Sequence, residues 1–377
     1  MNFDLAAGER EWIEVLGAFA REAVAPGAEE RNERRIFSRE LWRTLAEMGL
    51  MGLTIPAAEG GRGVGYLPFA LALETLTAQG HDVGLTVSWM IHCLLTDFHL
   101  RGLGSADQRA RYLPKLISGD WVLAFAVSEP EVGAHPKHMR ARAEREGDGW
   151  RLNATKTFVT NGPVADLFIV FAQTGDRPDG RKAISAFLVP ARSAGVDPSE
   201  ALDLPMARSS PHGTIHFRDV RVPATNLIGE EGSAYERVTK QFRELEDSFA
   251  LPMMAGHFAW TLELLGDRLR GDAAAGAASG EFGLALACRD GMETLGRKLA
   301  WLRDHGRAGA DAFSRTLFAA GTLAGEARAA ISRVAEAAPA EPGTPLARAL
   351  DDMALLSIGR GAERRRLERF GARALEG

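Results

Sequence analysis

The stretch of sequence that decides the fold is WVLAFAVSEPEVGAHPKHMRARAEREGDGWRLNATKTFVTNG, residues 121–162. It begins with a short apolar run, typical of a buried strand, that ends in Ser128-Glu129-Pro130. Gly133 follows three residues after the proline, and an alternating pair of strands then ends in Phe158-Val159-Thr160-Asn161-Gly162. At the start of this stretch, near residue 121, the hydrophobic period changes from one typical of helices to one typical of strands.

Helical periodicity dominates the chain before this stretch. Trp12, Leu16, Phe19 and Ala23 recur at spacings of four, three and four residues, which places them on one face of a helix. Residues 55–63 contain three glycines and a proline, so a loop is expected to interrupt the helices there.

Strand patterns dominate the middle of the chain. Residues 166–172 and 184–189 are apolar enough to be buried strands, and residues 215–222 alternate between apolar and polar. Several short strands with turn signals between them predict a small barrel or sandwich. From residue 229 the pattern is helical again and rich in alanine. We therefore expect an α+β multidomain protein with an N-terminal helical domain over residues 1–120, a middle β-domain over 121–228 and a C-terminal helical domain over 229–377.

Composition and charge bound the classes of function. The chain has 377 residues, of which 46% are hydrophobic and 25% charged, as in a globular protein. A net charge of −5 provides no basic surface for nucleic acid. Two cysteines far apart in the sequence, Cys93 and Cys288, suggest neither a disulfide framework nor a metal site. We recognise no signal peptide and no apolar run of membrane-spanning length, so we expect a cytoplasmic protein that does not enter the membrane.

The two ends of the quoted stretch resemble motifs of the acyl-CoA dehydrogenase family of flavoenzymes. Ser128-Glu129-Pro130 with Gly133 is similar to the first motif, and residues 158–162 are similar to the second. Residues 217–223, FRDVRVP, look like the end of the family's middle domain. The resemblance implies a middle β-barrel domain between an N-terminal helical domain and a C-terminal four-helix-bundle domain.

The resemblance also implies FAD as the cofactor, with its flavin ring held by the two motifs. Ser128 and Thr160 keep hydroxyls where the family uses them. Taken alone, Ser128 is also compatible with a strand-end cap and Phe158 with ordinary core, and the ordered pair of motifs favours the cofactor. The residues expected to hold the cofactor are Phe125, Ala126, Val127, Ser128, Gly133, Ala134, Phe158, Val159 and Thr160.

The reaction that the resemblance implies removes two hydrogens from the Cα–Cβ bond of an acyl thioester, and it requires a carboxylate base. Arg360 stands where most of the family has its C-terminal catalytic glutamate, and an arginine stays protonated. We expect Arg360 to bind substrate, through its backbone N–H or by pairing with a carboxylate, or else to lie on the surface. Some members place the base on the first helix after the barrel, and Glu246 matches that position. The other interpretation of Glu246 is an acid that suits the dipole of a helix start.

Two further departures concern the rest of the cofactor and the substrate arm. Ala134 replaces a serine that the family has near the cofactor and the thioester, so we expect altered substrate binding there. Glu281-Phe282-Gly283 keeps part of a motif that reaches the FAD of a neighbouring subunit but lacks its arginine. The sequence thus keeps the ring site and changes the contacts to the remainder of FAD.

Three functions are compatible with this pattern. The first is an FAD-dependent dehydrogenase of an acyl thioester, carried by coenzyme A or a carrier protein, in a specialised biosynthetic pathway. By resemblance its electron acceptor is an electron-transfer flavoprotein, and the chain forms a homodimer, a homotetramer or a hetero-oligomer. The second is a non-catalytic subunit of a mixed complex. The third is an oxygen-using flavoprotein, such as a monooxygenase or nitroalkane oxidase relative.

Overall fold

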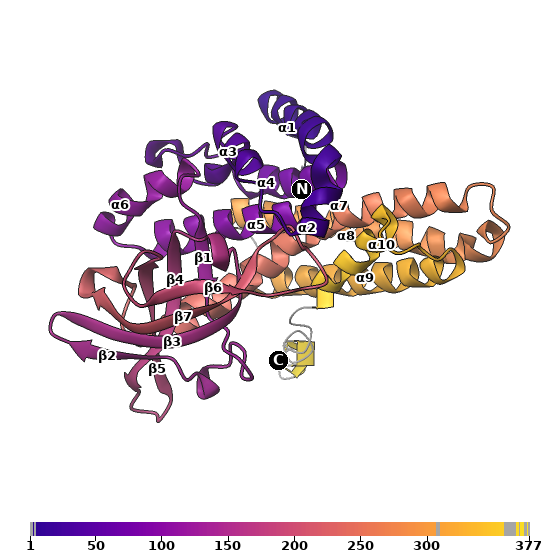
Figure 1. The fold of residues 1–377 in the computed structure, drawn as a ribbon. Coiled ribbons are helices and arrows are strands. Elements are labelled where there is room, and N and C mark those ends of the chain that lie inside the picture. Colours follow the sequence, from indigo (N-terminus) through magenta and orange to yellow (C-terminus); the bar gives the residue numbers. More distant parts are fainter. Residues whose placement is uncertain are drawn as a thin grey trace.

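The computed structural model describes residues 3, 5–306, 310–357, 367, 368, 370–372 and 375 (Figure 1). Helical elements make up the first part of the chain, as expected. They are α1 (Ala7–Phe19), η1 (Ala20–Val24), η2 (Ala25–Gly27), α2 (Ala28–Arg34), α3 (Arg39–Glu47), η3 (Leu50–Gly52), η4 (Ala57–Glu59), α4 (Tyr66–Gly80), α5 (Val83–Leu94), η5 (Leu95–Arg101) and α6 (Ala106–Ile117).

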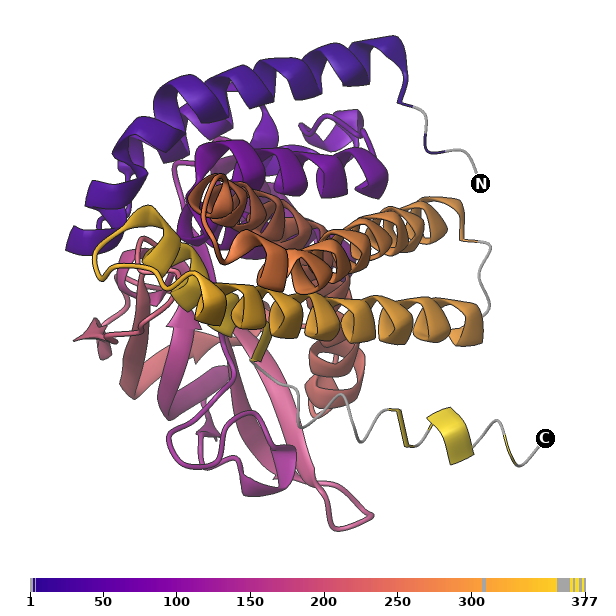
Figure 2. The ribbon, with the colours of Figure 1, turned by 90° about the vertical axis from the view of Figure 1, so that its right-hand side faces the viewer.

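Local sequence explains where these helices begin and end. The predicted apolar face is confirmed in part: Trp12 and Leu16 of α1 are buried, Phe19 is half-buried, and Ala23 lies in η1 and is exposed. Together α1, η1, η2 and α2 run on from one another along the outside of the molecule (Figure 2). Ser38 caps α3 by accepting the N–H of Leu41 at 3.2 Å, and Gly49, with a φ of 74°, follows its last turn.

One stretch of this helical part is long and apolar enough to cross a membrane, which the sequence expectation missed. It covers Val83–Arg101, that is, α5 and η5, and 94% of the relevant window is buried inside the protein. Such burial is typical of a core helix, whose sides are covered by other parts of the same chain.

The middle of the chain forms a mixed sheet with the strand order β6-β7-β3-β2-β4-β5-β8, and β1 pairs in parallel with β4. The strands are β1 (Leu123–Ala126), β2 (Arg142–Glu146), β3 (Gly149–Thr160), β4 (Leu167–Asp176), β5 (Lys182–Pro190), β6 (Val196–Ala201), β7 (His212–Pro223) and β8 (Leu227–Ile228). Short 3₁₀ turns connect them: η6 (Pro136–His138), η7 (Gly162–Val164) and η8 (Ala224–Asn226). The domain boundaries at residues 120 and 228 stay predictions.

The expected barrel is wrong, because this sheet does not close. Strands β6 and β8 stand at the two ends of the order, and no ladder joins them within the described residues. Strand β1 ends at Ala126, and beyond it the N–H of Thr157 on β3 donates to the carbonyl of Ser128 at 2.9 Å. Two register shifts in the β3–β7 pair bend β3 in this region.

The C-terminal part is helical, with three long helices and a short one in the described residues. They are η9 (Tyr235–Thr239), α7 (Lys240–Leu269), α8 (Ala275–His305), α9 (Ala310–Ala337), α10 (Pro345–Asp352) and η10 (Met353–Ser357). Helix α7 packs against both α8 and α9 and also against α4 of the first helical part. It therefore joins the two helical parts of the chain.

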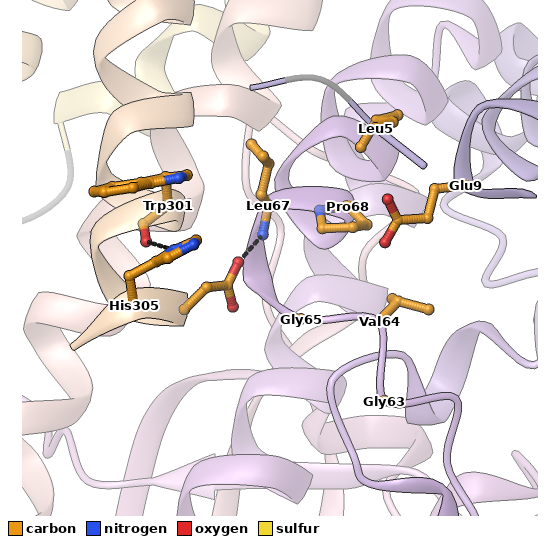
Figure 3. A pocket seen from close by; sticks show the side chains of 10 residues that line it. Leu5, Glu9, Gly63, Val64, Gly65, Leu67, Pro68, Trp301 and His305 are labelled. Atoms are coloured by element: carbon orange, nitrogen blue, oxygen red, sulfur yellow. Dashed lines mark hydrogen bonds between the residues drawn. The ribbon is translucent and has the colours of Figure 1, made fainter. Parts of the chain in front are cut away.

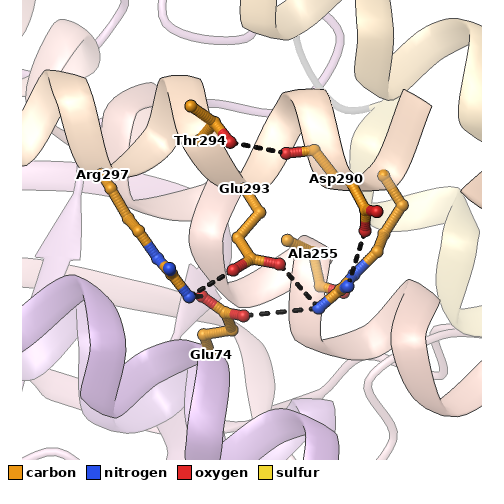
Figure 4. A network of polar contacts seen from close by, with 7 residues as sticks. Glu74, Ala255, Asp290, Glu293, Thr294 and Arg297 are labelled. Carbon is orange, nitrogen blue, oxygen red and sulfur yellow. Dashed lines mark hydrogen bonds and ion pairs between the residues drawn. The ribbon is translucent and has the colours of Figure 1, made fainter. Parts of the chain in front are cut away.

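A network of charged side chains fixes α4 against α8 (Figure 4). Glu74 of α4 accepts hydrogen bonds from Arg289 and Arg297 of α8, each at 3.4 Å, and Glu293 pairs with the same two arginines. Burial raises the pKa of Glu74 to about 7 in spite of the two arginines. The network thus holds a desolvated carboxyl between helices that are far apart in the sequence.

We expect Gly256→Ala to destabilise the fold, because α4 and α7 touch at this glycine. A Cβ there would lie 2.3 Å from the carbonyl oxygen of Glu74, and the backbone of α4 cannot move aside without separating the helices. The free energy of unfolding in a urea titration should fall by about 1–3 kcal/mol. Gly280→Ala is the control, since nothing lies within 4 Å of its Cβ position and alanine favours a helix. Equal stability of the two variants would contradict this packing.

Candidate active site

A buried ion pair joins the two motifs of the quoted stretch. The Nζ atom of Lys156 on β3 donates to Glu129 Oε1 at 2.8 Å and to the carbonyl of Val127 at 3.1 Å. The Glu129 carboxylate also accepts the backbone N–H groups of Arg140 at 2.6 Å and Ala141 at 2.9 Å. Burial lowers the pKa of Lys156 to about 8, and Glu129 opposes that shift, so the ammonium stays charged at neutral pH. Both residues lie in the stretch 121–162, but the sequence analysis did not pair them.

The backbone on both sides of this pair is forced into unusual conformations. Glu131 and Gly133 have φ values of 67° and 61° in a tight turn that the backbone bonds between Glu129 and Gly133 close. On β3, the register shift after Lys156 places Phe158 at a φ of 54° with its side chain 61% exposed. A large exposed aromatic in a left-handed conformation is held there by the surrounding structure, as is common at functional sites.

The predicted cofactor residues differ in their burial. Ala126, Val127 and Val159 are buried in the core as whole residues. Gly133 and Ala134 are exposed, and a Cβ at Gly133 would meet open space. Ser128, Phe125 and Thr160 are half-buried between these groups. In the described part of the chain, no protein group hydrogen-bonds the Ser128 hydroxyl.

Thr160 has a partner that sequence reasoning missed. Its hydroxyl lies 3.0 Å from Nε2 of His212, whose Nδ1 lies 3.0 Å from the carbonyl of Ser210. A carbonyl only accepts, so Nδ1 carries the proton and Nε2 accepts from the Thr160 hydroxyl. Burial lowers the pKa of His212, which keeps the ring neutral. The only signal in the sequence was a histidine at the start of a strand.

The structure brings Phe125 of β1 close to the helix that carries Glu246. The ring of Phe125 lies 4.9 Å from that of Phe242 on α7, and Glu246 follows Phe242 by one turn of the helix. Glu246 lies beyond the first turn of α7, where the effect of the helix dipole has faded. This position favours the predicted base over the helix-start interpretation.

The surroundings of Glu246 leave its carboxyl partly open. The side chain is 31% exposed, and its Oε2 lies 3.6 Å from Nη1 of Arg243. Arg243 Nε pairs more closely with Asp247, at 2.8 Å. Burial raises the pKa of Glu246, Arg243 opposes the shift and Asp247 adds to it. Once ionised, the carboxylate of Glu246 is therefore more basic than that of a free glutamate, which suits a general base.

Two cavities in the described part of the chain lie apart from Glu246. The larger, about 710 Å³, lies between the start of α4 and the end of α8, where Asp304 accepts the N–H groups of Tyr66 and Leu67 at 2.7 and 2.9 Å (Figure 3). None of the predicted site residues lines it. The smaller, about 520 Å³, adjoins the first motif through Glu129 and Pro130. Arg360 lies outside the described residues.

Comparison with known proteins agrees with this architecture. The family model "Acyl-CoA dehydrogenase, N-terminal domain" matches residues 7–120, and "Acyl-CoA dehydrogenase, middle domain" matches residues 124–220. A mitochondrial isovaleryl-CoA dehydrogenase of Pongo abelii is 36% identical over 230 residues, which are 60% of this chain and 54% of the relative. An L-prolyl-[peptidyl-carrier protein] dehydrogenase of Pseudomonas fluorescens is 34% identical over 234 residues, 62% of this chain and 60% of the relative. The chain thus matches these relatives over little more than half of their length.

Solved structures extend the likeness of fold to the whole chain. Butyryl-CoA dehydrogenase from Megasphaera elsdenii superposes with a TM-score of 0.89 at 23% identity and covers 100% of both chains. PigA with FAD and proline superposes with a TM-score of 0.88 at 24% identity, again over 100% of both chains. At these identities the likeness shows the fold.

We expect Lys156→Met to destabilise the protein strongly, because the Glu129 carboxylate would stay buried without its counter-ion. The loss of unfolding free energy should be about 3–5 kcal/mol, measured by urea denaturation. Arg151→Met on the same strand is the matched control, since its ion pair with Glu146 is exposed and such a pair contributes at most about 1 kcal/mol. A loss of stability no larger than in the control would show that the buried pair does not hold the two motifs together.

Proposed function

This chain belongs to the acyl-CoA dehydrogenase family, and we propose that it is an FAD-dependent oxidoreductase that removes two hydrogens from the Cα–Cβ bond of an acyl thioester. One observation carries the proposal. The Glu129–Lys156 pair fixes the two motif segments side by side. Phe125 at their edge contacts Phe242, which lies one helical turn before Glu246. A flat ring site and an acid beside it are what this reaction requires.

The residues of the two motifs fit a flavin. The exposed ring of Phe158 offers an aromatic surface, the Ser128 hydroxyl is open to a hydrogen bond, and the open space over Gly133 admits a close ligand. We propose that the buried Ala126, Val127 and Val159 contribute backbone groups, and that Thr160, held by His212, faces the ring edge as an acceptor. When bound, FAD would accept the hydride. PigA, which shares this fold, was solved with FAD.

Glu246 is the proposed base. Its carboxylate takes the α-hydrogen of the thioester as a proton (H⁺). The β-hydrogen leaves with both bonding electrons as hydride (H⁻), and the electrons of the broken Cα–H bond form the Cα=Cβ double bond. Half-burial of the side chain supports this role, since desolvation makes the carboxylate more basic. Ala134 and Arg360 are the proposed substrate contacts.

The carrier and the acyl group belong to the proposal as well. Relatives act on coenzyme A esters, as isovaleryl-CoA dehydrogenase does, or on a carrier-bound prolyl group. We propose an acyl thioester of either carrier as substrate, in a specialised biosynthetic pathway. We also propose that the electron acceptor is an electron-transfer flavoprotein, that the chain forms a homo-oligomer and that it lies in the cytoplasm.

We expect Glu246→Gln to retain FAD and to lower the rate of flavin reduction by acyl thioesters about 10²-fold or more, because the amide cannot take a proton. The measurement is anaerobic stopped-flow absorbance of the flavin. Glu244 lies two residues away and is exposed, so the flavin of Glu244→Gln should be reduced at the wild-type rate. A purified chain that is colourless and gains flavin only with a partner chain would instead favour a non-catalytic subunit, and rapid reoxidation by O₂ would favour an oxygen-using enzyme.

The pH dependence of reduction provides a separate test of the base. The pKa of Glu246 is raised from 4.5, so the active carboxylate forms only at a pH above that value, and the rate should rise with pH through the raised pKa. The acid limb should therefore lie above pH 4.5 in the wild type and vanish in Glu246→Gln. An unchanged acid limb in the variant would assign the titration to another group.

A further inference from the structure

Asp352 is a buried carboxyl at the end of α10 that the proposed reaction does not use. Only 1% of the residue is exposed. Its Oδ1 accepts the backbone N–H of Ala207 at 2.6 Å, and its Oδ2 has no hydrogen-bond partner within the described residues. Ala207 has a φ of 48°, a left-handed conformation that residues other than glycine rarely adopt. This one carboxyl therefore joins α10 to an unusual backbone position that is far away in the sequence.

The charges around Asp352 do not offset its burial. Arg348, one turn earlier on α10, favours the ionised carboxyl, but its guanidinium donates to the carbonyl of His81 at 2.7 Å. Asp82 at the start of α5 and the neighbouring Asp351 oppose ionisation. Burial raises the pKa of Asp352 to about 7, so its charge changes near neutral pH. The other charged or titratable side chains that face this cluster are those of Glu29 and Arg31 on α2 and His257 on α7.

The chain around Ala207 links α10 to the candidate active site. Residues 202–211, which we call the connecting loop, lie between β6 and β7 and lead directly into His212. The carbonyl of Ser210 in this loop lies 3.0 Å from Nδ1 of His212, and Nε2 of the same ring lies 3.0 Å from the hydroxyl of Thr160. A displacement of the connecting loop at Ala207 therefore alters the support of Thr160 in the second motif.

We propose that Asp352 is a pH-sensitive latch, which in its neutral form holds α10 against the connecting loop and on ionisation loosens the loop and the support of Thr160. A carboxylate is solvated far better by water than by the interior, so ionisation favours the state in which Asp352 leaves its site. The pKa of the buried carboxyl lies above its ordinary value of 3.8, so its contribution to stability is greatest in acid and is lost as the pH rises from 3.8 to about 7. Retention of the cofactor should weaken over the same range. That last step rests on the proposed function, whereas the latch itself does not.

Hydrogen–deuterium exchange of the full chain tests the latch without any ligand. We expect the protection of residues 202–211, corrected for the intrinsic exchange rate, to fall about tenfold or more between about pH 5 and about pH 8 in the wild type. Asp352→Asn keeps an oxygen that accepts the N–H of Ala207 and cannot ionise, so it should lose this pH dependence. Asp351→Asn is the matched control, since Asp351 is exposed and its variant should behave as the wild type does.

Two results of this experiment would overturn the latch. One is a wild-type loop whose protection does not change with pH, which decides the matter even if Asp352→Asn fails to fold. The other is an equal fall in the wild type and in Asp352→Asn, which would assign the titration to another group.

The dissociation constant of FAD, measured by flavin fluorescence, tests the link to the cofactor site. It should rise with pH in the wild type and in Asp351→Asn and stay constant in Asp352→Asn. An affinity that does not change with pH while the connecting loop opens would refute the link to Thr160. If the chain binds no FAD at any pH, the proposed function fails, and the exchange measurement still decides the latch.

Discussion

The ion pair between Glu129 and Lys156 is the interaction on which the rest of the candidate site depends. Both side chains are almost completely buried, and the carboxylate is saturated by Lys156 and two backbone N–H groups. A buried charge tolerates little displacement, because loss of any partner leaves it unpaired in a medium of low polarity. The pair therefore fixes the end of β1 and the bulge of β3 relative to one another. Phe125, Ser128 and Phe158 take their positions from that constraint.

The helical parts complete the site from the other side. Helix α7 contacts α4 at Gly256 and also packs against α8 and α9. Its Phe242 contacts Phe125, just before the first motif. The network of Glu74 with Arg289 and Arg297 holds α4 against α8. These contacts determine where α7 passes over the sheet and hence where Glu246 lies. The proposed base on this helix does not depend on the C-terminal segment, where the sequence analysis predicts Arg360 at the position of the family's glutamate.

Polar groups near the site fall into those that the fold satisfies and those that it leaves open. His212 and Thr160 satisfy each other, and Asp97 is held by Thr54 and Tyr66. The half-buried Ser128 hydroxyl and the buried nitrogens of His99 have no such partners within the described residues. The Ser128 hydroxyl is therefore accessible to a ligand, whereas the His99 nitrogens are enclosed among aromatic rings.

The sequence by itself determined the order of helical, β-rich and helical parts, the family, and the positions of the two motifs, because these follow from local periodicity and from residues adjacent in the chain. It also placed Glu246 on the helix after the sheet. Only the tertiary structure decided that the sheet stays open, that Glu129 meets Lys156, that His212 holds Thr160 and that His99 lies between Phe125 and Phe242. Each of these contacts joins residues far apart in the sequence. Neither propensity nor spacing specifies such a pairing, which depends on how complete strands and helices pack.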